Sequence, residues 1–333
     1  QRRLTLLTLL TLLIGSPNTE SMDTAFTPSV AASGTVIVVV GAAGTPEYAP
    51  QFARWADLWK EACKKGNVEF IGIGLDPNEN ASDRARLQET LAKQARQSAA
   101  PLWLVLIGHG TFDGRVARFN LRGPDVSAGD LADWLKPMNR PIAVINTASA
   151  SGPFLKELSA PGRVVITATK SGFEHNFARF GQYLAEAIAQ PQADLDKDGQ
   201  TSLLEAYLTA SHAVGAFYTA AGRLATEHAL LDDNGDALGT PAEWFRGIRP
   251  VQRAREGVSL DGYRAHQLHL VHSETEAAMP SDLRAKRDRL ELQIIELRDT
   301  KSRYSQTEYF ARLEPLVREI ARIYERAESM AGR

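Results

Sequence analysis

The sequence predicts an α/β protein with an open, mostly parallel sheet covered by helices on both faces. Five short apolar runs in the first half of the chain predict the strands, at residues 35–40, 68–74, 102–107, 142–145 and 163–167. Their continuous Val, Ile and Leu content is typical of strands buried on both faces, as in parallel sheets. Helix-like segments separate the runs, and strands that alternate with helices are the pattern of crossover units in a parallel sheet.

The predicted helices follow from their composition and end signals. Residues 48–65 form the first helix, after a strand that ends in Gly41-Ala42-Ala43-Gly44. Residues 81–98 are polar, have high helix propensity and carry Asn80 or Ser82 as a cap. Shorter helices are expected at 128–135, 154–158 and 177–189, each beside one of the later strands.

Two of the predicted strands end in residues that carry chemistry. One strand runs into Gly108-His109-Gly110, and the next runs into Ala148-Ser149-Ala150-Ser151-Gly152. Their separation of about forty residues suits one strand-helix-strand crossover. If the two strands are neighbours, His109 and Ser149 emerge at the carboxyl edge of the sheet, where open α/β sheets build their sites.

This pair of motifs resembles the caspase-like cysteine peptidases, the group that contains caspases, legumains, gingipains and bacterial relatives. Gly108-His109-Gly110 is similar to the histidine motif of that family, and residues 148–152 are similar to its nucleophile motif, Ala-Cys-x-Ser-Gly. The resemblance covers about residues 33–190 and implies a caspase-like sheet, His109 and Ser149 as catalytic candidates, and Gly110 as a candidate oxyanion donor. One position departs from the family, because Ser149 stands where the family has cysteine.

The exchange of cysteine for serine matters chemically. A thiol reaches its nucleophilic thiolate form near neutral pH, whereas a serine hydroxyl needs a well-aligned base that a third group orients. The resemblance implies that the family's histidine serves mainly the substrate side, so the serine form is expected to lose most activity. Asp113 and Asp125 are the candidate orienters of His109.

A calcium-binding loop is predicted just past the last of these helices. Residues 194–205 read Asp-Leu-Asp-Lys-Asp-Gly-Gln-Thr-Ser-Leu-Leu-Glu, which follows the EF-hand pattern of oxygen ligands around a glycine at position six. A hard cation needs several oxygens, and the glycine permits the sharp turn. The predicted metal ligands are Asp194, Asp196, Asp198, Gln200, Ser202 and Glu205. The alternative interpretation is an acidic cap on the following helix.

A second acidic turn follows at residues 232–240. Asp232, Asn234 and Asp236 form a second possible cation site, with a turn-rich loop as the alternative. The turn lacks a glutamate at position twelve, because Glu243 falls one residue short or one over, depending on the register. A helix is expected to end just before it, near residues 228–230.

The C-terminal part predicts a helical hairpin. Residues 281–298 and 305–326 form two charged helices, and Ser305 with Glu308 matches a capping box. An apolar stripe with four-three spacing suits packing as a short coiled coil; its members are Tyr309, Leu313, Leu316, Ile320 and Ile323. The hairpin is either a packing appendage or an arm that forms homo- or hetero-oligomers through residues 281–331.

Bulk properties set the remaining expectations. A formal net charge of -2 and 23% charged residues argue against nucleic acid as the main partner. The basic start and the Leu-rich run up to Ile14 are typical of a secretory signal peptide, too short to span a bilayer, so a secreted or periplasmic location is expected. Cys63 is the single cysteine, so no intrachain disulfide forms, and we expect a small core residue there.

The expected organisation is a signal peptide and lead-in at 1–24, a caspase-like domain at 33–190, an EF-hand-like segment at 190–250, a connector at 251–280 and the hairpin at 281–331. Three functions stay open. The chain is a secreted, calcium-binding pseudopeptidase that keeps a cleft for a peptide or protein ligand, or an active hydrolase that uses Ser149 and His109, or an assembly component that acts through its hairpin. Whether it is an enzyme is undecided, and the serine favours an inactive protein.

Overall fold

The computed structural model describes residues 34–76, 82–95 and 100–331. The predicted signal peptide and lead-in lie outside these residues. Among the described residues, no helix is both long and apolar enough to cross a bilayer.

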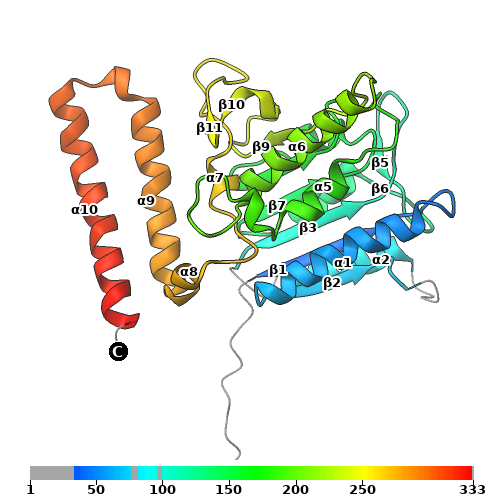
Figure 1. The fold of residues 1–333 in the computed structure, drawn as a ribbon, viewed down its shortest axis with the longest axis horizontal. Coiled ribbons are helices and arrows are strands. Elements are labelled where there is room, and N and C mark those ends of the chain that lie inside the picture. Colours follow the sequence, from blue (N-terminus) through cyan, green and yellow to red (C-terminus); the bar gives the residue numbers. More distant parts are fainter. Residues whose placement is uncertain (1–33, 77–81, 96–99, 332–333) are drawn as a thin grey trace, which may run out of the picture. The chain divides into compact units, whose positions relative to one another are not determined.

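A six-stranded sheet forms the centre of the structure, in the order β2-β1-β3-β7-β8-β9 (Figure 1). Its parallel strands are β1 (Thr35–Val40), β2 (Glu69–Ile73), β3 (Leu102–Ile107), β7 (Ile142–Asn146) and β8 (Arg163–Thr167). Neighbouring pairs among these five are parallel throughout, so the predicted mostly parallel α/β architecture is confirmed.

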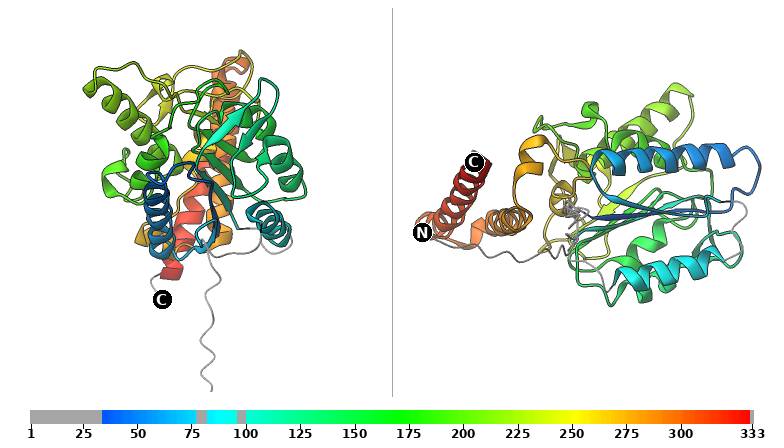
Figure 2. Two further views of the ribbon diagram at one scale, coloured as in Figure 1. Left: turned by 90° about the vertical axis from the view of Figure 1, so that its right-hand side faces the viewer. Right: turned by 90° about the horizontal axis from the view of Figure 1, so that it is seen from below.

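Helices cover both faces of this sheet (Figure 2). Alternate strand residues point to opposite faces, so each strand feeds two cores. One core joins the sheet to α1 (Ala49–Lys65), α5 (Phe180–Ala187) and α6 (Leu203–Ala220). The other joins it to α2 (Asp83–Gln94), α3 (Ala128–Leu135) and α4 (Gly152–Leu158). Cys63 lies in the first core and is 1% exposed, as expected for a core residue.

Two elements differ from the sequence-based expectation. The last strand of the sheet, β9 (Leu230–Asp232), is antiparallel to β8 and occupies a region where a helix end was expected. The expected helix is wrong because α6 already ends at Ala220. A small antiparallel sheet of β4 (Gly110–Phe112), β5 (Ala117–Phe119) and β6 (Val126–Ser127) also follows His109 directly. Such strands of two or three residues are too short to show periodicity in sequence.

In the segment from 191 to 278, α6 is the one long element, and β9 and the remaining elements are short. These are η1 (Pro191–Ala193), η2 (Ala242–Trp244), β10 (Phe245–Arg246), β11 (Arg249–Pro250), α7 (Tyr263–His266) and α8 (Glu274–Ala278). Loops therefore carry both acidic motifs of this region.

The predicted hairpin is present as α9 (Ser281–Asp299), η3 (Lys301–Arg303) and α10 (Gln306–Ala331). The two helices lie side by side in Figure 1, and buried Leu283 and Ile323 contribute to a small core of their own. The predicted capping box also forms, because the Ser305 amide and hydroxyl donate to the Glu308 carboxylate and the Glu308 amide donates back to Ser305.

Candidate functional site

The sheet brings the histidine and serine motifs to one edge. Strands β3 and β7 are direct neighbours, with Leu106 paired to Asn146 at their carboxyl ends. His109 lies two residues beyond β3, and Ser149 lies three residues beyond β7. The loops after β3 and β7 therefore meet, as the sequence predicts for neighbouring parallel strands.

Ser149 lies in a tight turn between β7 and α4. The turn starts where the Ala148 amide donates to the Asn146 side chain, and it bends at Ala150, whose φ is 53°. A left-handed φ at a residue other than glycine is uncommon and persists only where surrounding contacts hold it. Ser149 itself is 3% exposed.

The Ser149 hydroxyl is engaged by the backbone of Gly110. The Gly110 amide nitrogen lies 3.3 Å from the Ser149 Oγ, and this Oγ lies 3.4 Å from the Gly110 carbonyl oxygen. The hydroxyl therefore accepts one hydrogen bond and donates another without a side-chain base. The Gly110 amide is also the candidate oxyanion donor, so the Ser149 hydroxyl lies directly against this donor.

His109 is oriented by a backbone carbonyl rather than by a carboxylate. Its Nε2 lies 3.1 Å from the Ala43 carbonyl oxygen, and because a carbonyl only accepts, Nε2 carries the proton. The ring packs against three aromatic side chains: Tyr48, Phe52 and Phe177. Burial lowers the pKa of His109, although the bond to Ala43 opposes this shift, so the neutral imidazole is favoured.

Within the described ranges, no hydrogen bond joins the His109 ring to Ser149. The two candidate orienters are also engaged elsewhere. Asp113 pairs with Arg118 and closes the turn of the β4–β5 hairpin, while the Asp125 carboxylate accepts from the Leu121 amide. Neither is the partner of the His109 ring, whose Nε2 donates instead to the Ala43 carbonyl oxygen in the loop after β1.

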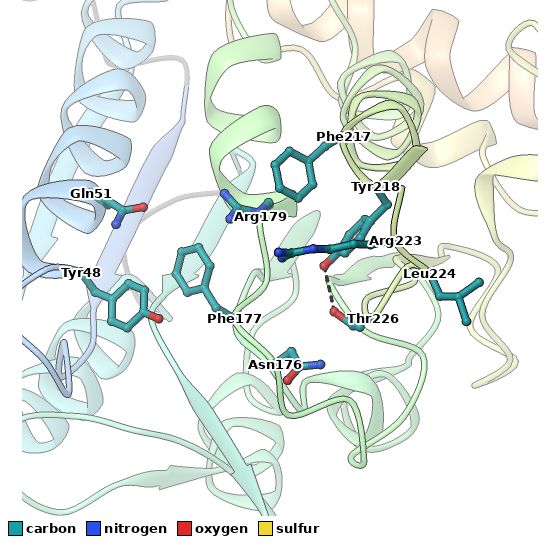
Figure 3. A pocket seen from close by; sticks show the side chains of 10 residues that line it. All are labelled: Tyr48, Gln51, Asn176, Phe177, Arg179, Phe217, Tyr218, Arg223, Leu224 and Thr226. Atoms are coloured by element: carbon teal, nitrogen blue, oxygen red, sulfur yellow. Dashed lines mark hydrogen bonds between the residues drawn. The ribbon is translucent and has the colours of Figure 1, made fainter. Parts of the chain in front are cut away.

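A cavity of about 490 Å³ lies beside the histidine (Figure 3). Tyr48 and Phe177 form one wall, with ring centroids 4.6 Å apart, and both rings also touch the His109 imidazole. The same two rings therefore lie between the cavity and the His109 imidazole.

Two arginines give this cavity its charge. Figure 3 shows Arg179 and Arg223 reaching into the space between Phe177 and the end of α6. The Arg179 guanidinium carbon lies 4.0 Å from the Phe217 ring centroid, a cation–π contact that leaves its N–H groups available. Among the described residues, neither guanidinium forms an ion pair with a carboxylate. The cavity is therefore suited to an anionic group.

Buried Glu227 fixes the position of Arg179. Its carboxylate accepts from the backbone amides of Arg179 and Phe180 and from the Tyr218 hydroxyl. These oxygens are thus occupied by backbone amides at the start of α5 and by the Tyr218 hydroxyl. A second cavity of about 430 Å³ lies behind Glu227 and is lined also by His228 and Glu243.

The first acidic loop gathers carboxylates as its motif predicts. Ligand atoms of Asp194, Asp196 and Asp198 all lie within 4.8 Å of one another. Gly199, at position six of the loop, has a φ of 89°, which a side chain would strain. Three converging carboxylates on a turn of this kind form a donor set that fits a hard cation such as Ca²⁺.

The other predicted ligands of this loop are engaged differently. Glu205 is fully buried and accepts from the Leu195 and Asp196 amides and from Ser202, with which it forms the capping box of α6. The Gln200 side chain accepts from the Ser273 amide. The loop therefore contains both the acidic cap of α6 and the cluster of carboxylates.

His266 joins this cluster from a distant part of the chain. Its Nε2 lies 3.0 Å from Asp196 Oδ2, and Asp196, Glu205 and His266 form a second group of potential ligand atoms within 4.8 Å. The sequence carries no signal for this contact, because 70 residues separate the two side chains.

The second acidic turn repeats the hydrogen bonds of the first. The amide at position six donates to the first carboxylate in both loops, at 3.1 Å for Gly199 with Asp194 and for Ala237 with Asp232. Ala237 also has a left-handed φ of 64°. Asp232 is therefore position one of this loop.

The register of the second loop follows from this match. With Asp232 at position one, Asn234 and Asp236 take positions three and five. Glu243 then takes position twelve, so the expectation that this turn lacks a glutamate there is wrong. The Asp236 amide donates to the Asn234 side chain, as the Asp198 amide does to Asp196. Glu243 lines the second cavity.

Comparison with known proteins gives only remote similarity. A scan against known protein families found no match, and neither did a search of curated proteins. Among solved structures, the chain is similar to the Drosophila initiator caspase Dronc, with 16% identity over 60% of this chain and 79% of the caspase and a TM-score of 0.41. It is also similar to a Geobacter sulfurreducens protein, with 12% identity over 54% of this chain and 88% of that protein and a TM-score of 0.37.

A third similar structure is Raptor from Chaetomium thermophilum, with 11% identity, a TM-score of 0.32, and coverage of 46% of this chain and 17% of that one. All three TM-scores lie below 0.5, so these similarities carry no information about the function of the site.

Proposed function

We propose that this protein is a calcium-binding, caspase-like pseudopeptidase that binds extended peptides at the edge of its sheet without cleaving them. The observation that carries the proposal is the double contact of the Ser149 hydroxyl with the Gly110 backbone. A serine becomes a nucleophile when a base within hydrogen-bond reach takes its proton. Here the proton of Ser149 is directed to a carbonyl oxygen, and the His109 Nε2 proton is directed to another.

The cavity beside His109 supports the choice of ligand. Two guanidinium groups, Arg179 and Arg223, face a space that aromatic rings line. Guanidinium groups bind carboxylates through paired hydrogen bonds. The proposed ligand is therefore a peptide with an acidic side chain that enters this cavity while its backbone passes Gly110.

Calcium is proposed at the loop from Asp194 to Glu205. The converging carboxylates of Asp194, Asp196 and Asp198 support a first site, and the matched hydrogen bonds of the loop from Asp232 support a second. The ion would neutralise mutually repelling carboxylates at the start of α6. A secreted or periplasmic location, proposed from the composition before residue 24, would supply such an ion readily.

The C-terminal hairpin is proposed as a site of homo- or hetero-oligomerisation, supported by its length and by apolar side chains of α10 that stay exposed, such as Phe310 and Val317. Deleting residues 281–333 should then lower the molecular mass measured by light scattering to that of one chain.

The test of the proposed function is a peptide-library experiment in the presence of calcium. Binding is read by affinity capture and cleavage by mass spectrometry, for wild type, Ser149→Ala, His109→Ala and Ser149→Cys. We expect wild type to retain acidic peptides without cleaving them and Ser149→Cys to gain cleavage. Cleavage by wild type that both alanine variants abolish would instead establish a serine-dependent hydrolase, and no peptide retention by any of the four would reject the peptide-binding function.

A further inference from the structure

The bend of the Ser149 turn is held from outside by one neighbouring loop. Ala150, in its left-handed conformation, donates its amide to the Glu174 carbonyl oxygen at 2.8 Å. Glu174 belongs to the loop that leaves β8, the strand on the far side of β7. Because nothing in the Ala150 side chain favours this φ, the contact with Glu174 compensates its conformational cost.

The same loop touches the rest of the turn. The Thr169 hydroxyl accepts from the Gly152 amide at 3.0 Å and also contacts the Ser151 hydroxyl. A Cβ placed on Gly152 would lie 2.4 Å from the Ser171 nitrogen, so the two backbones are in direct contact. The loop at residues 169–174 thus follows the turn closely from Ala150 to Gly152.

The Glu174 side chain shapes this loop. One of its oxygens accepts from the Lys170 amide at 2.9 Å, which closes the loop on itself. The other pairs with His228 Nδ1, from the segment before β9. The Glu174 side chain is only 13% exposed, so its oxygens make their hydrogen bonds mainly to these protein partners.

We propose that Glu174, tethered by His228, is a positioning residue that holds the Ser149 turn in its bent conformation. The carboxylate closes the loop, and the loop then presents the Glu174 carbonyl oxygen to the Ala150 amide. This inference rests on the proposed function only in taking Ser149 as the centre of the site.

Hydrogen exchange of the Ala150 amide, measured on the full chain with calcium, tests the positioning role. Glu174→Ala should accelerate this exchange about tenfold, since the Lys170 amide loses its carboxylate partner, the loop loosens and the turn opens locally. The slow amides of β7 should keep their rates, whereas a purely global loss of stability would accelerate both. Glu157→Ala is the matched control, because Glu157 is exposed on the helix that follows the turn.

A second, milder variant keeps the proposal testable if Glu174→Ala fails to fold. His228→Phe keeps an aromatic ring at this position and leaves the Glu174 carboxylate in place, but it removes the contact between His228 and Glu174. It should accelerate Ala150 exchange about threefold, as expected for a partly exposed pair. Exchange at Ala150 within twofold of wild type in both variants would overturn the proposal.

A second readout follows access to the reacting position. In a Ser149→Cys background, adding Glu174→Ala should raise the rate of thiol alkylation about fivefold, since the closed turn leaves position 149 almost without solvent contact. Cys63 should not react with the alkylating reagent, because it is 1% exposed and burial raises the pKa of its thiol to about 12. An unchanged alkylation rate would also contradict the positioning role, whether or not the protein binds peptides.

Discussion

The amide nitrogen of Gly110 lies 3.3 Å from the hydroxyl oxygen of Ser149, across two loops that leave neighbouring strands. This contact places a backbone donor beside the residue that occupies the nucleophile position of the resembled family. It also satisfies the hydroxyl without His109, whose Nε2 proton goes to Ala43. The backbone of Gly110 therefore satisfies the Ser149 hydroxyl, and no side-chain base among the described residues contacts it.

Gly110→Ala should disrupt this contact. A Cβ at Gly110 would lie 2.3 Å from the Ser149 carbonyl oxygen, which is backbone and cannot rotate away. We expect a loss of about 1–3 kcal/mol in the free energy of unfolding, measured by urea denaturation, because the two loops must move apart. Gly215→Ala in α6 is the control: it meets nothing within 4 Å and should stabilise the protein slightly. Equal effects of the two substitutions would contradict the close packing of these loops.

Charge removal in the cavity should weaken the binding of acidic peptides. Arg179→Ala and Arg223→Ala should each raise the dissociation constant about tenfold, since each removes a charge-assisted hydrogen bond. Fluorescence anisotropy with paired peptides, one with Asp and one with Asn, measures the effect. Lys156→Ala, an exposed lysine on α4 and the other face of the sheet, should change nothing. If wild type binds the Asp and Asn peptides equally, the arginines do not select the ligand.

Calcium should stabilise the protein through the first acidic loop. At a concentration one hundred times the dissociation constant, one site adds about 2.7 kcal/mol to the free energy of unfolding. Asp198→Asn should reduce this gain, because it removes one of three converging carboxylates, while Asp236→Asn reports on the second loop separately. Thermal unfolding with calcium or with EDTA measures both. A melting temperature that calcium leaves unchanged in wild type would reject both sites.

Acidification should destabilise the region around His269 and His272. Burial lowers the pKa of His269 to about 3 and that of His272 to about 4, and the Arg284 guanidinium, which donates to His272 Nε2, requires the neutral ring. Below the ordinary histidine pKa of about 6.5, the unfolded chain binds protons that the folded chain does not. The stability contributed by the neutral rings is thus complete above that pH and is lost as the pH falls towards 4.

Urea denaturation in EDTA at pH 7.5 and pH 5 tests this dependence. His272→Gln should lose less stability between the two pH values than wild type, by up to about 1.4 kcal/mol per pH unit. His212→Gln, at an exposed position, should follow wild type. Identical pH profiles for the two variants would contradict the assignment.

Much of the central sheet could be predicted because its strands are buried on both faces. A strand such as β3 appears in the sequence as an uninterrupted apolar run, and the polar residues after it mark its carboxyl end. The acidic loop from Asp194 is likewise recognisable, since its ligands lie close together in sequence. In contrast, β4 and β9 have three residues each, too few for a periodic pattern, and both were missed.

The sequence by itself determined the alternation of strands and helices, the arrival of His109 and Ser149 at neighbouring strand ends, and the clustering of Asp194, Asp196 and Asp198. These features depend on local composition and spacing, which the chain carries directly. Only the tertiary structure decided that a backbone carbonyl orients His109, that His266 reaches Asp196, and that Arg179 and Arg223 share a cavity. Such contacts join distant segments, and backbone groups that are identical at every residue leave no signature in a sequence.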